Sequence, residues 1–305
     1  MASRPADAPR SAAAGGKRLE LRALRFQGSR TTSRTAARVA VLLLLVVATV
    51  VTVLPLVWMV SASFKAPDAV FTLPIRWLPD ALRWENYTEA LTSRPFGRYA
   101  VNSIGVSLAS VAITVLLSAA AGYSFARFHY PGRDLLFVLV LATIVIPFEA
   151  IALPLYLQIH RWQWLNTYLG LTLPTALSPI GIFIMRQYIL GIPQDFLDSA
   201  RSEGASEPRI LVTIIWPLSL PALAAVAIFT FVWNWNNYLW PLLVVSRDWL
   251  RTLPLGMALF ENQLNVNYNQ VMAVAVFGAL PLVLMFILLQ RNFVRGVALT
   301  GLREG

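Results

Sequence analysis

The chain has 305 residues, of which 57% are hydrophobic and 13% are charged, and its formal net charge is +10. This composition excludes an ordinary soluble domain and predicts an all-α polytopic membrane protein. The sequence contains no cysteine, which excludes disulfides and thiolate metal sites. Its two histidines, His129 and His160, both lie in predicted loops, so we expect no metal centre in this chain.

The first 38 residues are predicted to form a disordered basic tail. They contain nine Lys or Arg residues and two acidic residues, a composition that favours disorder and contact with anionic lipid headgroups. A cleaved signal peptide is the competing interpretation. The apolar run that follows is about 22 residues long, whereas a cleaved signal usually has about 7–15 apolar residues. We therefore predict an uncleaved membrane anchor.

Six apolar segments in residues 39–305 are long enough to cross a bilayer. About 20 residues with a rise of about 1.5 Å each cover the roughly 30 Å hydrocarbon layer, and a spanning chain must be helical to satisfy its backbone polar groups. The predicted spans are about 39–60, 103–126, 135–157, 168–185, 217–244 and 271–290. Residues 39–305 are therefore predicted to form a six-helix transmembrane domain.

The distribution of Lys and Arg predicts the orientation of these spans. An even number of spans places both termini on one side, and the segments on that side contain 17 Lys or Arg residues against 8 on the other. Positive residues accumulate on the cytoplasmic side, so we expect both termini and the insert 186–216 to be cytoplasmic. The net charge mainly reflects this topology, and it favours membrane lipid over nucleic acid as a partner.

The second span contains small and hydroxyl residues that break up its apolar pattern, among them Ser107, Ser110, Thr114 and Ser118. Such residues allow helices to approach closely in lipid. Tight helix packing is favoured over a role in lining a pathway.

Glu149 is the one acidic or basic residue within the predicted spans. It lies in the third span between Pro147 and Pro154, where a carboxylate at mid-membrane depth indicates a functional site. The alternative is a protonated or amide-paired glutamate that holds two helices together. Both interpretations remain open at this stage.

The fifth span contains Asn234, Asn236 and Asn237 beside Trp233 and Tyr238. An amide facing hydrocarbon would cost several kcal/mol, so these asparagines should face other helices or a wet cavity. Amides and aromatic faces also suit a polyhydroxylated solute. The competing interpretation is an aromatic belt at the membrane interface. With Glu149, these five residues are the candidate substrate-pathway residues.

A short polar helix is predicted at about 193–204, between the fourth and fifth spans. Pro193 suits the first turn of a helix, and Gly204 suits a left-handed C-terminal stop. Its apolar face is predicted to consist of Phe196, Leu197 and Ala200. A short helix of this kind can dock into a groove on a partner protein.

Several enzyme signatures are missing from the sequence. It contains no Gly-x-x-x-x-Gly-Lys-Ser/Thr nucleotide loop, no Gly-x-Ser-x-Gly elbow and no paired carboxylates. We therefore do not expect this chain to be an enzyme or to hydrolyse ATP itself.

The polar insert resembles a known loop. Asp198-Ser199-Ala200 and Gly204, followed by Ile215-Trp216-Pro217-Leu218, resemble the Glu-Ala-Ala…Gly…Leu-Pro loop of ABC-importer permeases. The body from about 39 to 305 is similar to the sugar-type branch, in particular to the smaller permease of maltose-type importers. The further supporting stretches are Asn102-Ser103, Tyr130-Pro131-Gly132, Ile146-Pro147, Pro154-Leu155-Tyr156, Trp233-Asn234-Trp235-Asn236 and Arg291-Asn292-Phe293-Val294-Arg295-Gly296.

The resemblance implies a type I ABC-importer permease in a bacterial inner membrane. The helix around Asp198 would enter a cleft on a cytoplasmic ATPase dimer, which would bind the ATP and Mg, while a second homologous permease would complete the pathway. An extracytoplasmic solute-binding protein would deliver a sugar or oligosaccharide. The residues implied in coupling are Asp198, Ser199, Ala200, Gly204 and Ala205. Asp198 and Ser199 depart from the family pattern, which usually has Glu and Ala at these positions.

Three alternatives remain at this stage. An ion-coupled secondary transporter would need ion sites at mid-membrane and commonly an inverted repeat, and only Glu149 meets the first requirement. A membrane scaffold without transport activity is the second alternative. The third keeps the architecture and changes the cargo to an amino acid, a peptide or a polyol phosphate.

Overall fold

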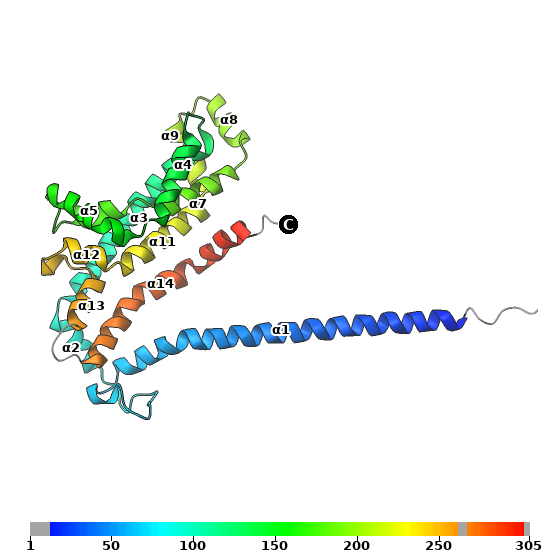
Figure 1. The fold of residues 1–305 in the computed structure, drawn as a ribbon, viewed down its shortest axis with the longest axis horizontal. Coiled ribbons are helices and arrows are strands. Elements are labelled where there is room, and N and C mark those ends of the chain that lie inside the picture. The colour runs from blue at the N-terminus through cyan, green and yellow to red at the C-terminus, as the bar shows by residue number, and fades with distance from the viewer. Residues whose placement is uncertain (1–12, 262–266, 302–305) are drawn as a thin grey trace, which may run out of the picture. The chain divides into compact units, whose positions relative to one another are not determined.

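The structure, a computed structural model, describes residues 13–261 and 267–301, with side chains described over 37–258 and 267–287. Throughout these ranges the ordered elements are helices, and none is a strand (Figure 1). The α-helices are α1 (Ala13–Ser63), α2 (Glu85–Ser93), α3 (Phe96–Arg127), α4 (Arg133–Ala142), α5 (Phe148–Arg161), α6 (Tyr168–Thr172), α7 (Pro179–Leu190), α8 (Asp195–Ser202), α9 (Glu207–Ile210), α10 (Trp216–Leu218), α11 (Leu220–Asn236), α12 (Leu239–Val244), α13 (Leu253–Glu261) and α14 (Tyr268–Gly301). The short 3-10 helices are η1 (Pro67–Ala69), η2 (Thr143–Val145), η3 (Leu173–Thr175) and η5 (Asp248–Leu250), and η4 (Leu211–Ile215) is a π-helical turn.

The chain divides into two compact units, Met1–Trp58 and Met59–Gly305. The described part of the first unit consists of α1, which begins at Ala13. Helix α1 covers residues 13–38 of the predicted basic tail, whose first 12 residues lie outside the described ranges, and the disorder of this tail remains a prediction. Residues 13–38 contain many Ala, Leu and Arg residues, which are good helix formers. They also extend an existing helix, so they avoid the cost of nucleating a new one.

Three helices are long and apolar enough to cross a membrane on their own, namely Ala37–Ser63, Phe96–Arg127 and Tyr268–Ile287. Three further candidates are bent helix pairs, with angles of 102° after Val145, 49° after Thr175 and 83° after Leu218. The described chain therefore offers up to six spans if each bent pair crosses once. The count of six and the cytoplasmic location of the termini remain predictions.

The bends divide the predicted third, fourth and fifth spans into helix pairs. Pro147 precedes α5, and Pro179 occupies the first turn of α7, where the Ser178 hydroxyl accepts a hydrogen bond from the Gly181 amide at 3.0 Å. Proline removes a backbone donor and blocks continuation of the preceding helix. At the third bend, α11 begins directly after Ser219 and has a proline in its first turn. Each break therefore coincides with a proline that starts a new helix.

Helix α3 is the centre of the second unit and packs most extensively against α7 and α11. Its inner face is made of small residues, and Ser107, Ser110 and Ser118 are at most 1% exposed. A Cβ added at Gly122 would lie 2.6 Å from the Met185 Cβ, so the two helices meet where α3 has no side chain. The prediction that these small residues serve helix packing is confirmed.

Candidate functional site

The polar insert between α7 and α9 forms the short helix α8 at one end of the second unit, opposite α2 (Figure 1). Helix α8 begins at Asp195, so Pro193 lies just before the helix rather than in its first turn, which corrects that prediction. Asp195 and Asp198 lie in the first turn, where the helix dipole stabilises negative charge. Gly204 has φ +83°, and the predicted glycine stop is therefore confirmed.

The apolar residues of α8 do not form one free face. Leu197 is completely buried in a core cluster that includes Ile189 and Ile210, and Ala200 packs against the same cluster. Phe196 is 53% exposed. The prediction of a shared outward apolar face is therefore wrong, because Leu197 and Ala200 anchor α8 to its own chain and leave Phe196 alone facing outward.

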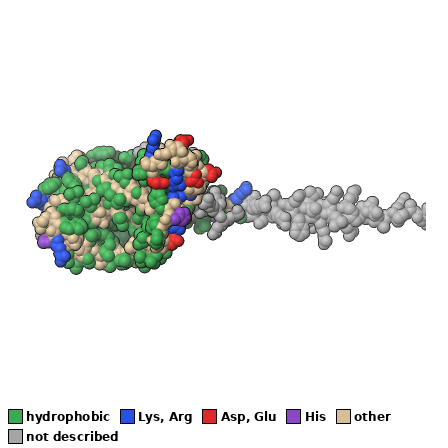
Figure 2. Space-filling model, turned by 90° about the horizontal axis from the view of Figure 1, so that it is seen from above, with side chains coloured by type: hydrophobic (Ala, Val, Ile, Leu, Met, Phe, Trp, Pro, Cys, Tyr) green, Lys and Arg blue, Asp and Glu red, His purple; other side chains and the backbone are tan. Residues whose placement is uncertain are grey.

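The outward side of α8 is polar around that phenylalanine. Asp198 and Ser199 are exposed, and Gly204 is exposed at the end of the helix. Ala205 is half-buried, and its amide donates to the Ala200 carbonyl oxygen at 3.0 Å, which closes the turn after the helix. In the space-filling view, acidic side chains gather together with basic ones in one area, further basic side chains lie at the opposite edge, and much of the face between them is hydrophobic (Figure 2).

Arg201 links α8 to the following helix α9. Its guanidinium donates to the Glu207 carboxylate at 2.8 Å and to the Asp198 carboxylate at 3.0 Å. The Tyr123 hydroxyl, on α3, donates to the second Glu207 oxygen at 2.5 Å. The hydrogen bond to Glu207 raises the pKa of Arg201, so this side chain stays positively charged. One carboxylate thus joins three segments of the chain.

Arg127, in the last turn of α3, holds the beginning of the insert. Its guanidinium donates to the Ile189 carbonyl oxygen at 2.6 Å, to the Gln194 side-chain oxygen at 2.7 Å and to the Ile192 carbonyl oxygen. The Gln194 amide in turn donates to Asp198 at 3.0 Å. The planar fork of an arginine suits several acceptors held in a fixed arrangement.

Four residues of this network were not predicted from the sequence: Tyr123, Arg127, Arg201 and Glu207. Tyr123 and Arg127 are four residues apart on one helix, so they lie on one face of α3. The sequence does not indicate which acceptors these two side chains bond to, because the acceptors are distant in the chain, as Glu207 is from Tyr123 by 84 residues.

The substrate-pathway candidates divide by exposure. Asn234 is buried, donates to the Thr230 carbonyl oxygen at 2.9 Å and contacts Thr175. Asn237 ends α11, and its side-chain oxygen accepts a hydrogen bond from the Trp240 amide at 3.2 Å. Both side chains thus form hydrogen bonds within the chain itself.

The other candidates lie on the surface of the isolated chain. Trp233, Asn236 and Tyr238 are exposed around the end of α11, and Glu149 is exposed in the first turn of α5. The Phe148 ring lies 5.7 Å from the Trp233 ring, centre to centre. Phe148 directly precedes Glu149, so this contact places the start of α5 beside the exposed Trp233 of α11. Among the described residues, no group of three or more His, Cys, Asp and Glu is arranged to hold a metal ion.

Comparison with known proteins decides the family. Residues 115–299, more than half of the chain, match the family described as "Binding-protein-dependent transport system inner membrane component". The chain belongs to this family. It is the permease subunit of an ABC importer, a multi-pass protein of the bacterial membrane, and the resemblance drawn from its sequence is confirmed.

Several characterised permeases are similar to this chain over most of their length. The arabinooligosaccharide transport permease AraQ of Halalkalibacterium halodurans is 35% identical over 256 residues, covering 83% of this chain and 92% of AraQ. The diacetylchitobiose uptake permease NgcG of Streptomyces coelicolor is 30% identical, and the match covers 84% of this chain and 85% of NgcG. The sn-glycerol-3-phosphate permease UgpE of Pectobacterium atrosepticum is 34% identical, and the match covers 75% of this chain and 84% of UgpE.

A solved structure supports the fold independently. A chain of a bacterial ABC transporter involved in the import of the acidic polysaccharide alginate aligns with a TM-score of 0.74 and 21% identity, covering 82% of this chain and 94% of that chain. The same type of transporter in complex with an alginate pentasaccharide-bound periplasmic protein aligns with a TM-score of 0.58 and 14% identity. The all-helical architecture with broken spans is therefore that of an ABC-importer permease.

Proposed function

We propose that α8 is the coupling helix through which a separate cytoplasmic ATPase dimer drives this permease. The observation that supports this proposal is the asymmetry of α8. One side is anchored by Leu197 in the core, and Arg201 and Arg127 hold the helix by hydrogen bonds. The other side exposes Phe196 and Asp198, the latter with 58% of its side chain accessible. A firmly held helix with a mixed apolar and acidic outer side suits a groove on a partner.

The residues proposed for contact with the ATPase are Asp198 and Ser199, while Ala200, Gly204 and Ala205 shape the turn that presents them. Asp198 has a shorter reach than the glutamate usual in the family, but it keeps the negative charge. ATP and Mg are bound by the ATPase in this proposal, and the permease itself needs no cofactor. Both termini and α8 lie on the cytoplasmic side, in agreement with the distribution of Lys and Arg.

The proposed machine contains two further proteins. A second, homologous permease would cover the membrane-embedded face that includes the exposed Trp233, Asn236, Tyr238 and Glu149. A polar or charged group facing hydrocarbon is costly, so these side chains are better placed along a shared wet pathway than against lipid. An extracytoplasmic solute-binding protein would deliver the cargo to the side opposite α8.

We propose a sugar or oligosaccharide as the cargo. Exposed amide and aromatic side chains around the end of α11 offer the hydrogen bonds and apolar faces that a polyhydroxylated solute uses. A phosphorylated polyol is the second candidate, since one relative at 34% identity is a glycerol-3-phosphate permease. Uptake of labelled arabino-oligosaccharides and of glycerol-3-phosphate into the same reconstituted vesicles separates the two.

The first experiment is a pull-down of the tagged chain in mild detergent, followed by an assay for ATP hydrolysis. We expect the wild-type chain to retain an ATPase and a second permease. Asp198→Lys should lose the ATPase and keep the second permease. The control is Asp68→Lys, the same charge reversal at an exposed acid in η1. Equal ATPase retention in both variants would contradict the coupling role of α8, and uptake that follows an ion gradient without ATP would contradict the importer mechanism.

A further inference from the structure

The connection between α1 and α2 exposes an unusual amount of apolar surface. Residues 64–84 form an irregular loop in the second unit, at the end opposite α8 (Figure 1). Its exposed large apolar side chains are Phe71, Leu73, Ile75, Trp77, Leu78, Leu82 and Trp84. Leu73 is 90% exposed and Leu78 is 78% exposed. Several large exposed apolar side chains within one short connection indicate a surface that another phase or molecule covers.

Polar contacts hold the two halves of this loop together and tie it to the last turn of α1. The Ser61 hydroxyl donates to the Trp77 carbonyl oxygen, and the Lys65 ammonium group donates to the Arg76 carbonyl oxygen. The Arg83 amide donates to the Phe64 carbonyl oxygen at 3.2 Å. The middle of the loop is therefore held level with Ser61, which is part of the candidate membrane span that ends at Ser63.

The first residue of a second candidate span, α14, also contacts the loop. The Phe71 ring lies 5.0 Å from the Tyr268 ring in an edge-to-face contact, and Tyr268 is the first residue of α14. The apolar segment Tyr268–Ile287 is itself long enough to cross the membrane. The loop is thus held between the terminal residues of two membrane helices, which fixes its depth at the membrane–water boundary.

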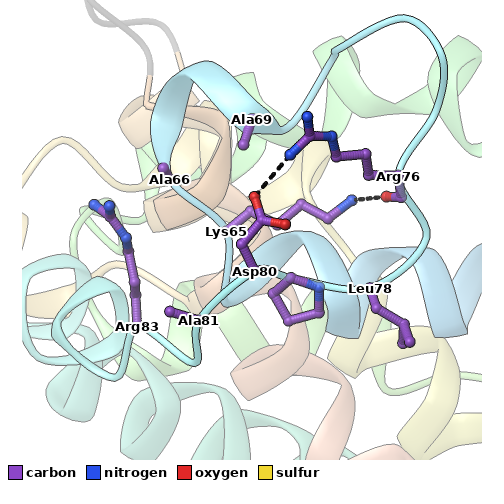
Figure 3. Close-up of a pocket in the computed structure, with 9 residues that line it drawn as sticks. Lys65, Ala66, Ala69, Arg76, Leu78, Asp80, Ala81 and Arg83 are labelled. Carbon is purple, nitrogen blue, oxygen red and sulfur yellow. Dashed lines mark hydrogen bonds and ion pairs between the residues drawn. The ribbon is translucent and has the colours of Figure 1, made fainter.

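The side chains of the loop match that depth. Tryptophan is enriched at the membrane interface, where its amphipathic ring prefers the headgroup level. Arg76 and Asp80 form an ion pair at 2.9 Å beside Lys65, around a pocket of about 80 Å³, and Leu78 points away from these polar groups (Figure 3). Arg76 and Asp80 are thus paired with one another, whereas Leu73 and Leu78 remain largely exposed.

We propose that the apolar edge of residues 73–84 inserts into the headgroup and outer acyl region of the bilayer, at the side where α1 ends and α14 begins. The occupant is phospholipid, because the loop continues directly from one span and touches the start of another. This inference requires a chain that crosses the membrane, but it depends neither on the ATPase nor on the cargo. A solute-binding protein docking on the same edge is the competing occupant.

The chain contains no cysteine, so single-cysteine variants can carry a nitroxide spin label at one chosen position. The variants are Leu73→Cys and Leu78→Cys on the apolar edge, with Asp68→Cys as the control at an exposed acid of the same connection. The transporter is purified with its native partners and placed in nanodiscs of phosphatidylethanolamine and phosphatidylglycerol. Power saturation then compares collisions with lipid-soluble oxygen and with a water-soluble nickel chelate.

We expect the ratio of oxygen to nickel collisions to be several-fold higher at positions 73 and 78 than at position 68. A ratio at both edge positions equal to that of the control would overturn the proposal. Protection from nickel that develops only after loaded binding protein is added would also overturn it and would assign the edge to protein docking. All three labelled side chains are exposed, so the substitutions leave the packing of the loop unchanged.

Discussion

Gly204→Ala tests whether the conformation of the turn after α8 matters for coupling. Gly204 has φ +83°, and an added Cβ would meet no atom within 4 Å. The substitution therefore causes no clash, and its whole effect is the cost of a left-handed backbone with a side chain. That cost is about 1–2 kcal/mol. A cost of this size would lower the population of the native turn, relative to other conformations of the turn, roughly five- to thirtyfold.

Two other glycines provide matched controls. Gly132, between α3 and α4, has φ +78° and equally open space, so Gly132→Ala has the same strain at a different place. Gly97 in α3 also has open space but an ordinary helical backbone, so Gly97→Ala has no strain. The three variants separate the effect of strain from the effect of position.

The assay is retention of the ATPase on the tagged permease, together with ATP hydrolysis stimulated by the binding protein. We expect Gly204→Ala to lower both, because the strained turn no longer holds α8 in place. Gly132→Ala should lower the melting temperature in detergent and keep the ATPase, and Gly97→Ala should change neither quantity. The reasoning is refuted if Gly204→Ala retains as much ATPase and stimulation as Gly97→Ala does.

Five further substitutions test the packing and the pathway. Tyr123→Phe removes the hydroxyl that donates to the half-exposed Glu207 carboxylate at 2.5 Å. This change should lower the free energy of unfolding in detergent by about 1–2 kcal/mol. An unchanged melting temperature would contradict this expectation. Gly122→Ala should destabilise the chain by about 1–3 kcal/mol through overpacking against α7. Gly105→Ala, with no atom within 4 Å of the new Cβ, should leave stability unchanged. Asn234→Leu should lower stability, because the part-buried Thr175 hydroxyl loses the amide oxygen that accepts its hydrogen bond. Asn236→Leu should alter the KM of uptake without affecting stability, and an unchanged KM would remove Asn236 from the pathway.

Local chemistry allowed part of the site to be predicted from the sequence. Gly204 ends α8 because glycine tolerates a left-handed backbone, and this preference is independent of the rest of the fold. The small residues of α3 likewise indicated close packing, because small side chains let helices approach closely in lipid. Both predictions depend on residues that are near one another in the chain, and the structure confirms both.

The predictions that failed depend on contacts between distant segments. Leu197 and Phe196 are adjacent and both apolar, and only the core cluster around Ile189 decides that Leu197 turns inward. The bends of 102° and 83° could not be predicted from hydropathy alone, because an apolar run has the same composition whether it is straight or broken. The prolines marked possible breaks, but their angles depend on the packing of neighbouring helices.

Hydrogen bonds at both ends of α3 explain how this helix could transmit a displacement of α8. At one end, Tyr123 and Arg127 bond to the insert and to the helix that follows it. At the other end, the Asn102 amide donates to the carbonyl oxygens of Trp249 and Arg251, each at 2.9 Å. Between the two ends, the buried small residues hold α3 closely against α7 and α11.

A rigid helix bonded at both ends moves as one body, so a force applied at α8 would reach the opposite end of the unit with little loss to local bending. This is the physical reason to expect that Gly122→Ala, which alters only the spacing between α3 and α7, impairs coupled uptake while the tagged chain still retains the ATPase. Loss of ATPase retention in that variant would instead show that the overpacking disturbs α8 directly.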